Sequence, residues 1–485
     1  MPAAPPRRAP ARSAKRWRAR PPKNRPTSGR VSSPVATNTE PTDADRYPTL
    51  SDAGRAMLRH MREHPAAPLF RNASGNRLLA DEVAALRLYE RDIAQARFDW
   101  HPGSPPPWLD AFVADTFAQV PHYRALGRPP AFQDIHSVHR GDLAADVARF
   151  VPDPVPLQRM INFRTTGTTG HPLVLPSHPV VAARYLAYHK RALHRFGITL
   201  QHGAGQMGVM LLGMQQRCFT YVSVTPSMGE SGLAKINLHP DDWRHPDDRA
   251  RYIDQMQPEV IAGDPISFAA LLQLPVQHRP RALLSVSMAL SHGLRTQLAE
   301  RFACPVLDLY SMNEAGPLAV FDAEAGGHVL LQPGMYVEIL DAEGTALPPG
   351  QTGEITLSGG FNFCLPLLRY RTGDRGALAM AGDTPMIVGL QGRRPLRYRT
   401  AQGQWINNID LTHALAPLPL SRFVVHQHAD GSVKLSLPPA ELQHADAAAR
   451  RLAAALVGQP VQVVPLQHDD KVLQYSSDLA GSHAQ

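Results

Sequence analysis

The stretch R-T-T-G-T-T-G-H-P, residues 164–172, decides how the rest of the chain is interpreted. Four threonine hydroxyls and two glycines occupy six consecutive positions within it, namely Thr165, Thr166, Gly167, Thr168, Thr169 and Gly170. Glycine lets the backbone approach a ligand closely, and successive backbone N–H groups form a concavity that attracts negative charge. The stretch therefore predicts a loop that binds a polyphosphate. The alternative is a polar turn between two strands, because the loop matches neither G-x-x-x-x-G-K-[ST] nor G-x-G-x-x-G.

The positive net charge of +8 is concentrated at the N-terminus of the 485-residue chain. Ten of the 50 Lys and Arg residues lie within residues 1–30, and no acidic residue precedes Glu40. Subtracting these ten leaves 40 basic side chains against 42 acidic ones. Residues 1–48 are rich in Ala, Pro and Arg, which predicts a disordered tail. A transit peptide or a nucleic-acid-binding arm is the alternative, but no aromatic residue other than Trp17 lies among the basic residues of 1–30, so we predict no nucleic-acid partner.

The cysteine count excludes a disulfide framework. Cys218, Cys304 and Cys364 are far apart and odd in number, which also excludes a Cys-rich zinc site and favours the reducing cytoplasm. No run of about 18 apolar residues occurs, so we predict no transmembrane helix and no membrane partner. The 22 histidines show no H-E-x-x-H spacing, and we interpret most of them as surface or loop residues.

Helical and strand patterns alternate through the middle of the chain. Apolar spacing predicts helices at 81–97, 108–120, 180–196, 248–257, 266–274 and 292–302, and buried strands at 205–214, 258–265, 282–288 and 305–309. This alternation is typical of βαβ units in a mainly parallel sheet. Ligands of such sheets bind at the carboxyl ends of the strands.

The last of these strands, 305–309, leads into Tyr310-Ser311-Met312-Asn313-Glu314. A tyrosine at this position would stack on a base, and a carboxylate would hold Mg²⁺, which prefers hard oxygen ligands shared with phosphate. The alternative is that Glu314 only caps the following segment.

Beyond Gly327 the pattern changes to short strands with tight turns. Strands are predicted at 335–340, 353–359 and 367–378, which indicates a small antiparallel sheet or barrel. Asp374 follows Thr372-Gly373 at a turn, which would present its carboxylate to paired hydroxyls. An ordinary turn aspartate is the alternative.

Four of these segments together resemble the adenylate-forming enzymes, the superfamily of acyl-CoA synthetases, luciferases and peptide-synthetase adenylation domains. R-T-T-G-T-T-G-H-P resembles their phosphate loop, Y-S-M-N-E their Y-G-x-[ST]-E segment and Y-R-T-G-D their Y-x-T-G-D segment. Gly392-Arg393-Arg394 resembles the G-R-x-D hinge. VPHYRALG, AGDPISFAALL and LYSMNEAGPLA are similar to the phenylacetate-CoA ligase branch. The resemblance covers about residues 80–480.

The resemblance implies an α/β fold and a two-step reaction. The fold would have a large AMP-binding domain at 49–392, with mainly parallel sheets flanked by helices and a small β-barrel-like subdomain. A small, mobile α+β domain at 393–485 would follow. A carboxylate would attack the α-phosphorus of ATP to give an acyl adenylate and pyrophosphate. A thiol of CoA, or of the phosphopantetheine arm of an acyl carrier protein, would then take the acyl group.

The resemblance also implies roles for individual residues. Thr165 to Gly170, Thr168 among them, would bind the β- and γ-phosphates, and Tyr310 would stack on adenine. Glu314 would hold Mg²⁺, Asn313 would donate to a phosphate oxygen, and Asp374 would accept hydrogen bonds from the ribose. Arg393 would approach the ribose, and Lys471 would meet the α-phosphate and the substrate carboxylate.

Departures from the family pattern support a second hypothesis. Leu173 stands where many members have lysine, Ser311 and Asn313 replace glycine and a hydroxyl residue, and Pro395 occupies the hinge. Met288-Ala289-Leu290 replaces a Gly-rich segment, and Asp470 replaces the glycine before the lysine. Because proline fixes φ, Pro395 would restrict the rotation between the two half-reactions. The chain would then be a degenerate homologue that binds nucleotide without full turnover.

The sequence indicates less about the acyl substrate than about the nucleotide. The branch implies an aromatic acid, and a carrier-protein acceptor would suit a pigment or antibiotic pathway of secondary metabolism. Five residues could form an apolar pocket or simply pack in the core, namely Met210, Met214, Phe219, Tyr221 and Met228.

Overall fold

The structure describes most of the chain from residue 41 onward. The computed structural model describes residues 41–164, 173–201, 203–215, 218–392, 396–467, 474–479 and 482, and Thr42–Gln485 form one compact unit. Helix α1 (Asp43–Arg46) is capped by Thr42, and the buried Tyr47 hydroxyl donates to the Val222 carbonyl at 3.1 Å. The described part of the chain thus includes residues 41–48, while residues 1–40 lie outside it and the disordered tail remains a prediction.

The predicted helices are present within about two residues of their expected ends. Ahead of the first large strands come α2 (Asp52–Glu63), α3 (Ala80–Gln95), α4 (Leu109–Gln119), α5 (Pro121–Arg124), α6 (Arg140–Ala145) and α7 (Pro179–Arg195). Side-chain caps explain several starts. Ser51 accepts from the Gly54 amide at the start of α2, and Glu82 accepts from the Leu79 amide at 2.9 Å at the start of α3.

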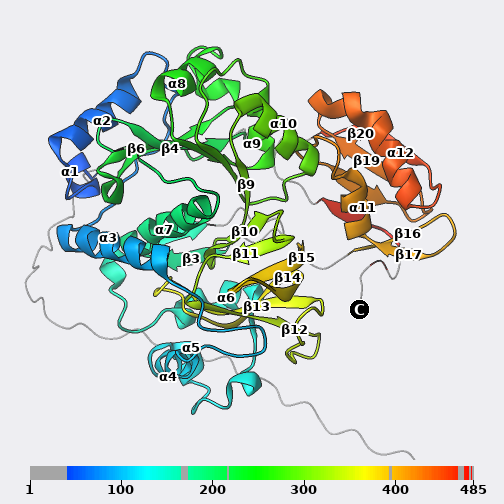
Figure 1. The fold of residues 1–485 in the computed structure, drawn as a ribbon, viewed down its shortest axis with the longest axis horizontal. Coiled ribbons are helices and arrows are strands. Elements are labelled where there is room, and N and C mark those ends of the chain that lie inside the picture. Colours follow the sequence, from blue (N-terminus) through cyan, green and yellow to red (C-terminus); the bar gives the residue numbers. More distant parts are fainter. Residues whose placement is uncertain are drawn as a thin grey trace, which may run out of the picture. The chain divides into compact units, whose positions relative to one another are not determined.

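A parallel sheet forms the middle of the fold, as the alternation predicts (Figure 1). β4 (Met207–Gly213), β6 (Ser231–Asn237), β7 (Val260–Gly263), β8 (Ala282–Ser285) and β9 (Val306–Met312) pair in parallel in the order β6-β4-β7-β8-β9. β5 (Tyr221–Thr225) pairs antiparallel with β6. Helices α8 (Asp248–Met256), α9 (Pro265–Leu272) and α10 (His292–Phe302) precede β7, β8 and β9. The α/β fold class is thereby confirmed.

Strand β9 joins two kinds of pairing, since it is parallel to β8 and antiparallel to β10 (Gly316–Asp322). From β10 the hydrogen bonding continues through β11 (Gly327–Leu330), β15 (Thr384–Gln391), β14 (Leu367–Ala381), β13 (Gly353–Gly359) and β12 (Met335–Leu340). The short β1 (Val138–His139) pairs with β14. The predicted antiparallel strands are therefore present and continue the hydrogen-bonded path of the parallel sheet.

The C-terminal part has a hydrophobic core of its own. It contains β16 (Arg397–Arg399), β17 (Trp405–Asn407), α11 (Asn408–Leu415), β18 (Val424–Gln427), β19 (Val433–Leu437), α12 (Ala445–Ala455), β20 (Val461–Pro465) and β21 (Tyr475–Ser477). Four of the strands form a sheet in the order β20-β19-β18-β21, packed around Leu411, Val425, Leu435 and Leu452. This matches the predicted α+β content, while the boundary at 392/393 and the mobility remain predictions.

No helix in the described ranges combines the length and the apolar character needed to cross a bilayer.

Candidate functional site

Two of the predicted nucleotide-binding residues are in direct contact. The Tyr310 hydroxyl donates a hydrogen bond to Asp374 Oδ2 at 2.8 Å, joining the end of β9 to β14. Burial raises the pKa of Tyr310 well above its ordinary value, and the neighbouring Asp374 carboxylate raises it further. Tyr310 therefore stays a neutral hydrogen-bond donor at physiological pH.

The backbone around Asp374 is fixed by its neighbours. The Asp374 amide donates to Thr372 Oγ1 at 3.0 Å, and the Gly373 amide donates to Glu354 Oε1 at 3.0 Å. Gly373 has φ +81°, a conformation that glycine adopts without strain. Asp374 is thus held in a defined position, which is more than an ordinary turn aspartate requires.

Glu314 lies in the turn between β9 and β10, where its side chain is 7% exposed. Arg140 Nη1 donates to Glu314 Oε1 at 2.6 Å, and the Tyr370 hydroxyl donates to the same oxygen at 3.3 Å. Tyr370 is on β14, four residues before Asp374. Two contacts, Tyr310–Asp374 and Tyr370–Glu314, therefore join β9 and the turn that follows it to β14, and these four residues form the group considered below.

Two hydrogen bonds from a buried side chain fix the turn that carries Glu314. The buried Gln332 Nε2 donates to the carbonyls of Ala315 and Pro317, both at 2.7 Å. Gly316 has φ +75°, and a Cβ at this position would lie 2.5 Å from Phe361 Cζ. The turn thus depends on a glycine for both its backbone conformation and the space it leaves for Phe361.

Asn313 and Tyr185 complete this edge of the site. Asn313 is exposed, and its carbonyl accepts from the Tyr185 hydroxyl of α7 at 3.4 Å. Burial, with a smaller contribution from the Glu314 carboxylate, raises the pKa of Tyr185 to about 12. The hydroxyls of Tyr185 and Tyr370 therefore both lie close to Glu314.

The flanks of the threonine–glycine loop are part of the same core as this group. β2 (Ile161–Arg164) and β3 (Val174–Ser177) pair antiparallel on either side of the loop. Leu173 is 2% exposed and belongs to the core cluster that also contains Ala315 and Tyr370. The position where many relatives have lysine is therefore occupied by a core leucine. Residues Thr165 to Gly170 themselves lie outside the described part.

Two further predicted residues, Arg393 and Lys471, and the hinge residue Pro395 also lie outside the described residues. The described residues just before Arg393 show where the chain leaves β15. Gln391 pairs with Arg375 across β15 and β14, and a Cβ on Gly392 would lie 4.0 Å from Asp374 Oδ1. The chain therefore passes directly beside Asp374 just before Arg393.

Sequence reasoning missed two residues of the site. Arg140 lies 174 residues from its partner Glu314, in a helix that no motif singles out, so no local signal marks it. Tyr370 was visible as the first letter of Y-R-T-G-D, although only the aspartate was given a role. Both contacts depend on long-range pairing, in which β1 brings the start of α6 beside β14.

Asp308 on β9 is a third residue that sequence reasoning missed. Burial raises its pKa to about 7, an effect that the Arg295 guanidinium and a backbone hydrogen bond from Leu290 only partly oppose. Asp308 lies two residues before Tyr310, and Leu290 belongs to the segment that replaces the Gly-rich stretch of relatives. A charged residue inside the apolar run PVLDL was the available signal.

The five residues considered for an apolar pocket do not all share one environment. Met210 on β4 is fully buried in a core cluster, and Met214 packs against the same cluster. The rings of Phe219 and Tyr221 contact each other, with centroids 5.5 Å apart. Phe219 is 54% exposed. Core packing therefore accounts for the two methionines.

The fold defined by this geometry is that of the adenylate-forming enzymes. The structure of 2-hydroxyisobutyryl-CoA ligase in the postadenylation state, in complex with R3-HIB-AMP, matches with a TM-score of 0.54 and 16% identity over 82% of this chain and 90% of that chain. The open conformation of the same ligase, with 2-HIB-AMP and CoA, matches with a TM-score of 0.51 and 16% identity over 72% of this chain and 89% of that chain. At this identity the likeness establishes the fold.

The sequence comparisons match part of the chain. Residues 160–363 match the family of AMP-binding enzymes. "Probable CoA ligase CCL9" of Humulus lupulus is 35% identical over 91 residues, which are 18% of this chain and 17% of that protein. Phenylacetate-coenzyme A ligase of Pseudomonas putida is 32% identical over 97 residues, 19% and 22% respectively. The matches thus span about a fifth of each curated relative. Residues 160–363 therefore resemble the AMP-binding enzymes, and the predicted resemblance to this group is confirmed for these residues.

Proposed function

We propose that the protein activates a carboxylic acid with ATP and transfers the acyl group to a thiol. The carboxylate oxygen attacks the α-phosphorus, the bond to the bridging oxygen breaks, and its electron pair leaves with pyrophosphate. The thiolate then attacks the acyl carbon and AMP leaves. The observation that carries this proposal is the pair of hydrogen bonds Tyr310–Asp374 and Tyr370–Glu314, which join the two segments Y-S-M-N-E and Y-R-T-G-D.

Different residues of this site would bind different parts of the nucleotide. Asp374, which accepts from Tyr310, would accept from the ribose hydroxyls through its carboxylate oxygens. The ring of Tyr310 would stack on adenine, and Thr165 to Gly170 would donate to the phosphates. Asn313 is exposed at the turn and would donate to a phosphate oxygen. Fixed donors of this kind stabilise charge that moves onto phosphate oxygens in the transition state.

Glu314 is the residue that would hold Mg²⁺. Mg²⁺ is commonly bound by one or two carboxylates together with substrate phosphates, so a single glutamate fits this donor set. Bound Mg²⁺ would neutralise charge on the phosphate oxygens. Arg140, at 2.6 Å from Glu314 Oε1, would hold the carboxylate in one orientation. Arg393 and Lys471 would approach the ribose and the α-phosphate, as the family resemblance implies.

A second candidate function is supported by the same contact. Because Arg140 neutralises Glu314, and because Leu173 is buried where relatives have lysine, the chain would be a homologue that binds nucleotide without full turnover. Pro395 at the hinge favours this alternative for the thioester step in particular.

The acid and the acceptor are proposed from the branch resemblance. We infer an aromatic acid, with CoA or a carrier-protein phosphopantetheine as the thiol, in a cytoplasmic pathway of secondary metabolism. We infer no nucleic-acid partner, because the basic excess is confined to the first 30 residues.

Pyrophosphate exchange into ATP tests the proposal. The purified chain is assayed with panels of benzoates, cinnamates and phenylacetates, each with and without CoA or a carrier protein. Acid-dependent exchange is the expected result, and Thr168→Ala, which removes one phosphate donor, should lower it about 10²-fold or more. Tight ATP binding without exchange for any acid would favour the degenerate homologue. Absence of both binding and exchange would overturn both proposals.

A further inference from the structure

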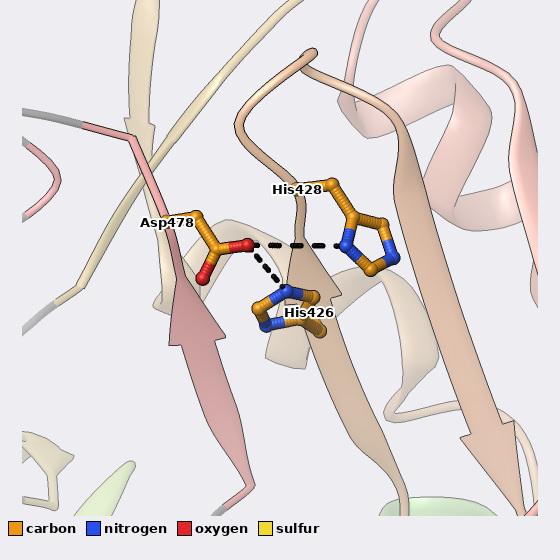
Figure 2. Close-up of side chains that lie close together, drawn as sticks. All are labelled: His426, His428 and Asp478. Atoms are coloured by element: carbon orange, nitrogen blue, oxygen red, sulfur yellow. Dashed lines mark hydrogen bonds and ion pairs between the residues drawn. The ribbon is translucent and has the colours of Figure 1, made fainter.

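Two histidines and an aspartate meet at the end of the C-terminal sheet, far along the chain from the site described above. His426 Nε2 lies 3.1 Å from Asp478 Oδ2, and His428 Nδ1 lies 3.9 Å from the same oxygen. Figure 2 shows both imidazole rings turned toward the Asp478 carboxylate. One ligand atom from each of the three residues lies within 4.8 Å of the other two.

The sequence places the two histidines on one side of the strand. Residues two apart in a strand point to the same face, and His426 and His428 have this spacing at the end of β18. The alternate residues, Val425 and Gln427, are fully buried on the opposite face. The histidines are therefore directed outward because their neighbours fill the core.

Backbone hydrogen bonds hold Asp478 and His428 in place, and His426 is paired with Lys434 and Ser476 within the sheet. The Asp478 amide donates to the Gln427 carbonyl at 2.9 Å, which fixes it beside β18 just after β21 ends. The His428 amide donates to the Ser432 carbonyl at 2.9 Å across the β18–β19 turn. The three side chains are therefore brought together by the fold itself.

Ser476 orients the first histidine. Its Oγ lies 2.8 Å from His426 Nδ1, while Nε2 of the same ring faces Asp478. A hydrogen bond to the second ring nitrogen is the usual way in which proteins orient a metal-binding imidazole. Asp430 in the nearby turn accepts from Ser432 instead, through its Oδ1, at 2.9 Å from the amide and 2.6 Å from the hydroxyl.

We propose that His426, His428 and Asp478 bind a divalent transition-metal ion of the Zn²⁺ type. Zn²⁺ takes nitrogen ligands at about 2.0–2.1 Å and carboxylate oxygen at about 2.0–2.2 Å in a tetrahedron, so its ligand atoms lie about 3.3 Å apart. The distances of 3.1 and 3.9 Å bracket this value. Imidazole suits Zn²⁺, Co²⁺ and Cu²⁺ rather than Mg²⁺ or Ca²⁺, which prefer oxygen. Water would take the fourth position.

The ion would join two parts of the chain that are far apart in sequence. β21 is the edge strand of the sheet and pairs with β18 through only three residues, from Val425–Tyr475 to Gln427–Ser477. A metal bound by His426, His428 and Asp478 would cross-link this edge strand to its neighbour. This role is independent of the proposed nucleotide chemistry.

Co²⁺ titration of the full chain, with any affinity tag removed, tests the proposal. Tetrahedral Co²⁺ absorbs strongly in the visible range, so one equivalent should produce this absorption, and Zn²⁺ should displace it while excess Mg²⁺ should not. Asp478→Asn and His428→Gln should each weaken Co²⁺ binding about 100-fold or more, since even the loss of an orienting residue costs 10–100-fold. Ser476→Ala should weaken it roughly ten-fold.

The matched control is His413→Gln, which changes an exposed histidine of α11 in the same part of the chain and should leave Co²⁺ binding unchanged. Circular dichroism confirms that each variant is folded. Asp478 is 52% exposed and its replacement by Asn keeps its shape, so the variant should fold. No visible absorption, or absorption that survives Asp478→Asn, or equal loss in His413→Gln, would each overturn the proposal.

Discussion

The Tyr310 hydroxyl donates to Asp374 Oδ2 at 2.8 Å and thereby connects two strands that begin about 60 residues apart in the sequence. Tyr310, which is expected to stack on adenine, and Asp374, which is expected to bind the ribose, are therefore in direct contact. Each of the two residues can be substituted separately, and the KM for ATP then shows what the other residue still contributes to nucleotide binding.

Asp374→Ala should raise the KM for ATP in the exchange assay roughly ten- to a hundred-fold. Hydrogen bonds to a charged group contribute about 1.5–3 kcal/mol each, and the variant loses the carboxylate that accepts from the ribose. Tyr310→Phe keeps the ring and should change the KM much less. Similar KM values for Asp374→Ala and wild type would show that Asp374 does not bind the nucleotide.

Arg140→Gln should lower the free energy of unfolding by about 3 kcal/mol, because it leaves the Glu314 carboxylate buried without its cationic partner. Denaturant titration measures this loss. Glu314→Gln removes the buried charge and should recover part of the stability in the double variant. It should also abolish exchange, since it removes the proposed Mg²⁺ ligand. Additive effects on stability in the double variant would show that the two side chains do not interact.

Gly316→Ala should destabilise the protein more than Gly326→Ala does. Both glycines have positive φ, +75° and +73°, so both substitutions carry the same backbone strain, on the order of 1 kcal/mol. A Cβ at Gly316 also meets Phe361 Cζ at 2.5 Å, whereas nothing lies within 4 Å of one at Gly326. The comparison of melting temperatures isolates the contact with Phe361, and equal values would mean that Phe361 moves aside freely.

Asp308 should make the stability depend on pH in a defined direction. Its pKa in the folded chain is about 7, above the value of about 4 expected in the unfolded chain. The folded state therefore binds the extra proton between these values, and its stability is lost as pH rises through this window. Asp308→Asn should become more stable relative to wild type from pH 4 to 7, with little further change above. The exposed Asp383→Asn is the control, and an identical profile for Asp308→Asn and wild type would contradict the prediction.

The sequence was informative wherever the signal was local. Periodicity predicted α3, α4, α7 and the strands of the parallel sheet, and the motif order predicted that Tyr310 and Asp374 would meet. Glycine and threonine spacing predicted a loop, and the structure describes its flanking strands β2 and β3.

Contacts that depend on tertiary pairing could not be predicted in this way. Arg140 reaches Glu314 only because β1 pairs with β14, and two residues of strand give no periodic signal. The sequence analysis gives His426 and His428 no role of their own and interprets most histidines as surface or loop residues, because a spacing of two is too common to indicate a metal site. Their third partner, Asp478, comes from β21, which joins the sheet from the far end of the chain.

Strand β9 is shared by the parallel and the antiparallel halves of the large sheet, and this has a consequence for how the protein can change. Because side chains alternate along a strand, the insertion or deletion of one residue within it would turn Tyr310 to the opposite face and would misalign both neighbouring strands at once. Surface loops elsewhere can vary in length without such a penalty. We therefore expect variants of this protein to differ in their loops while the length from Val306 to Gly316 stays constant.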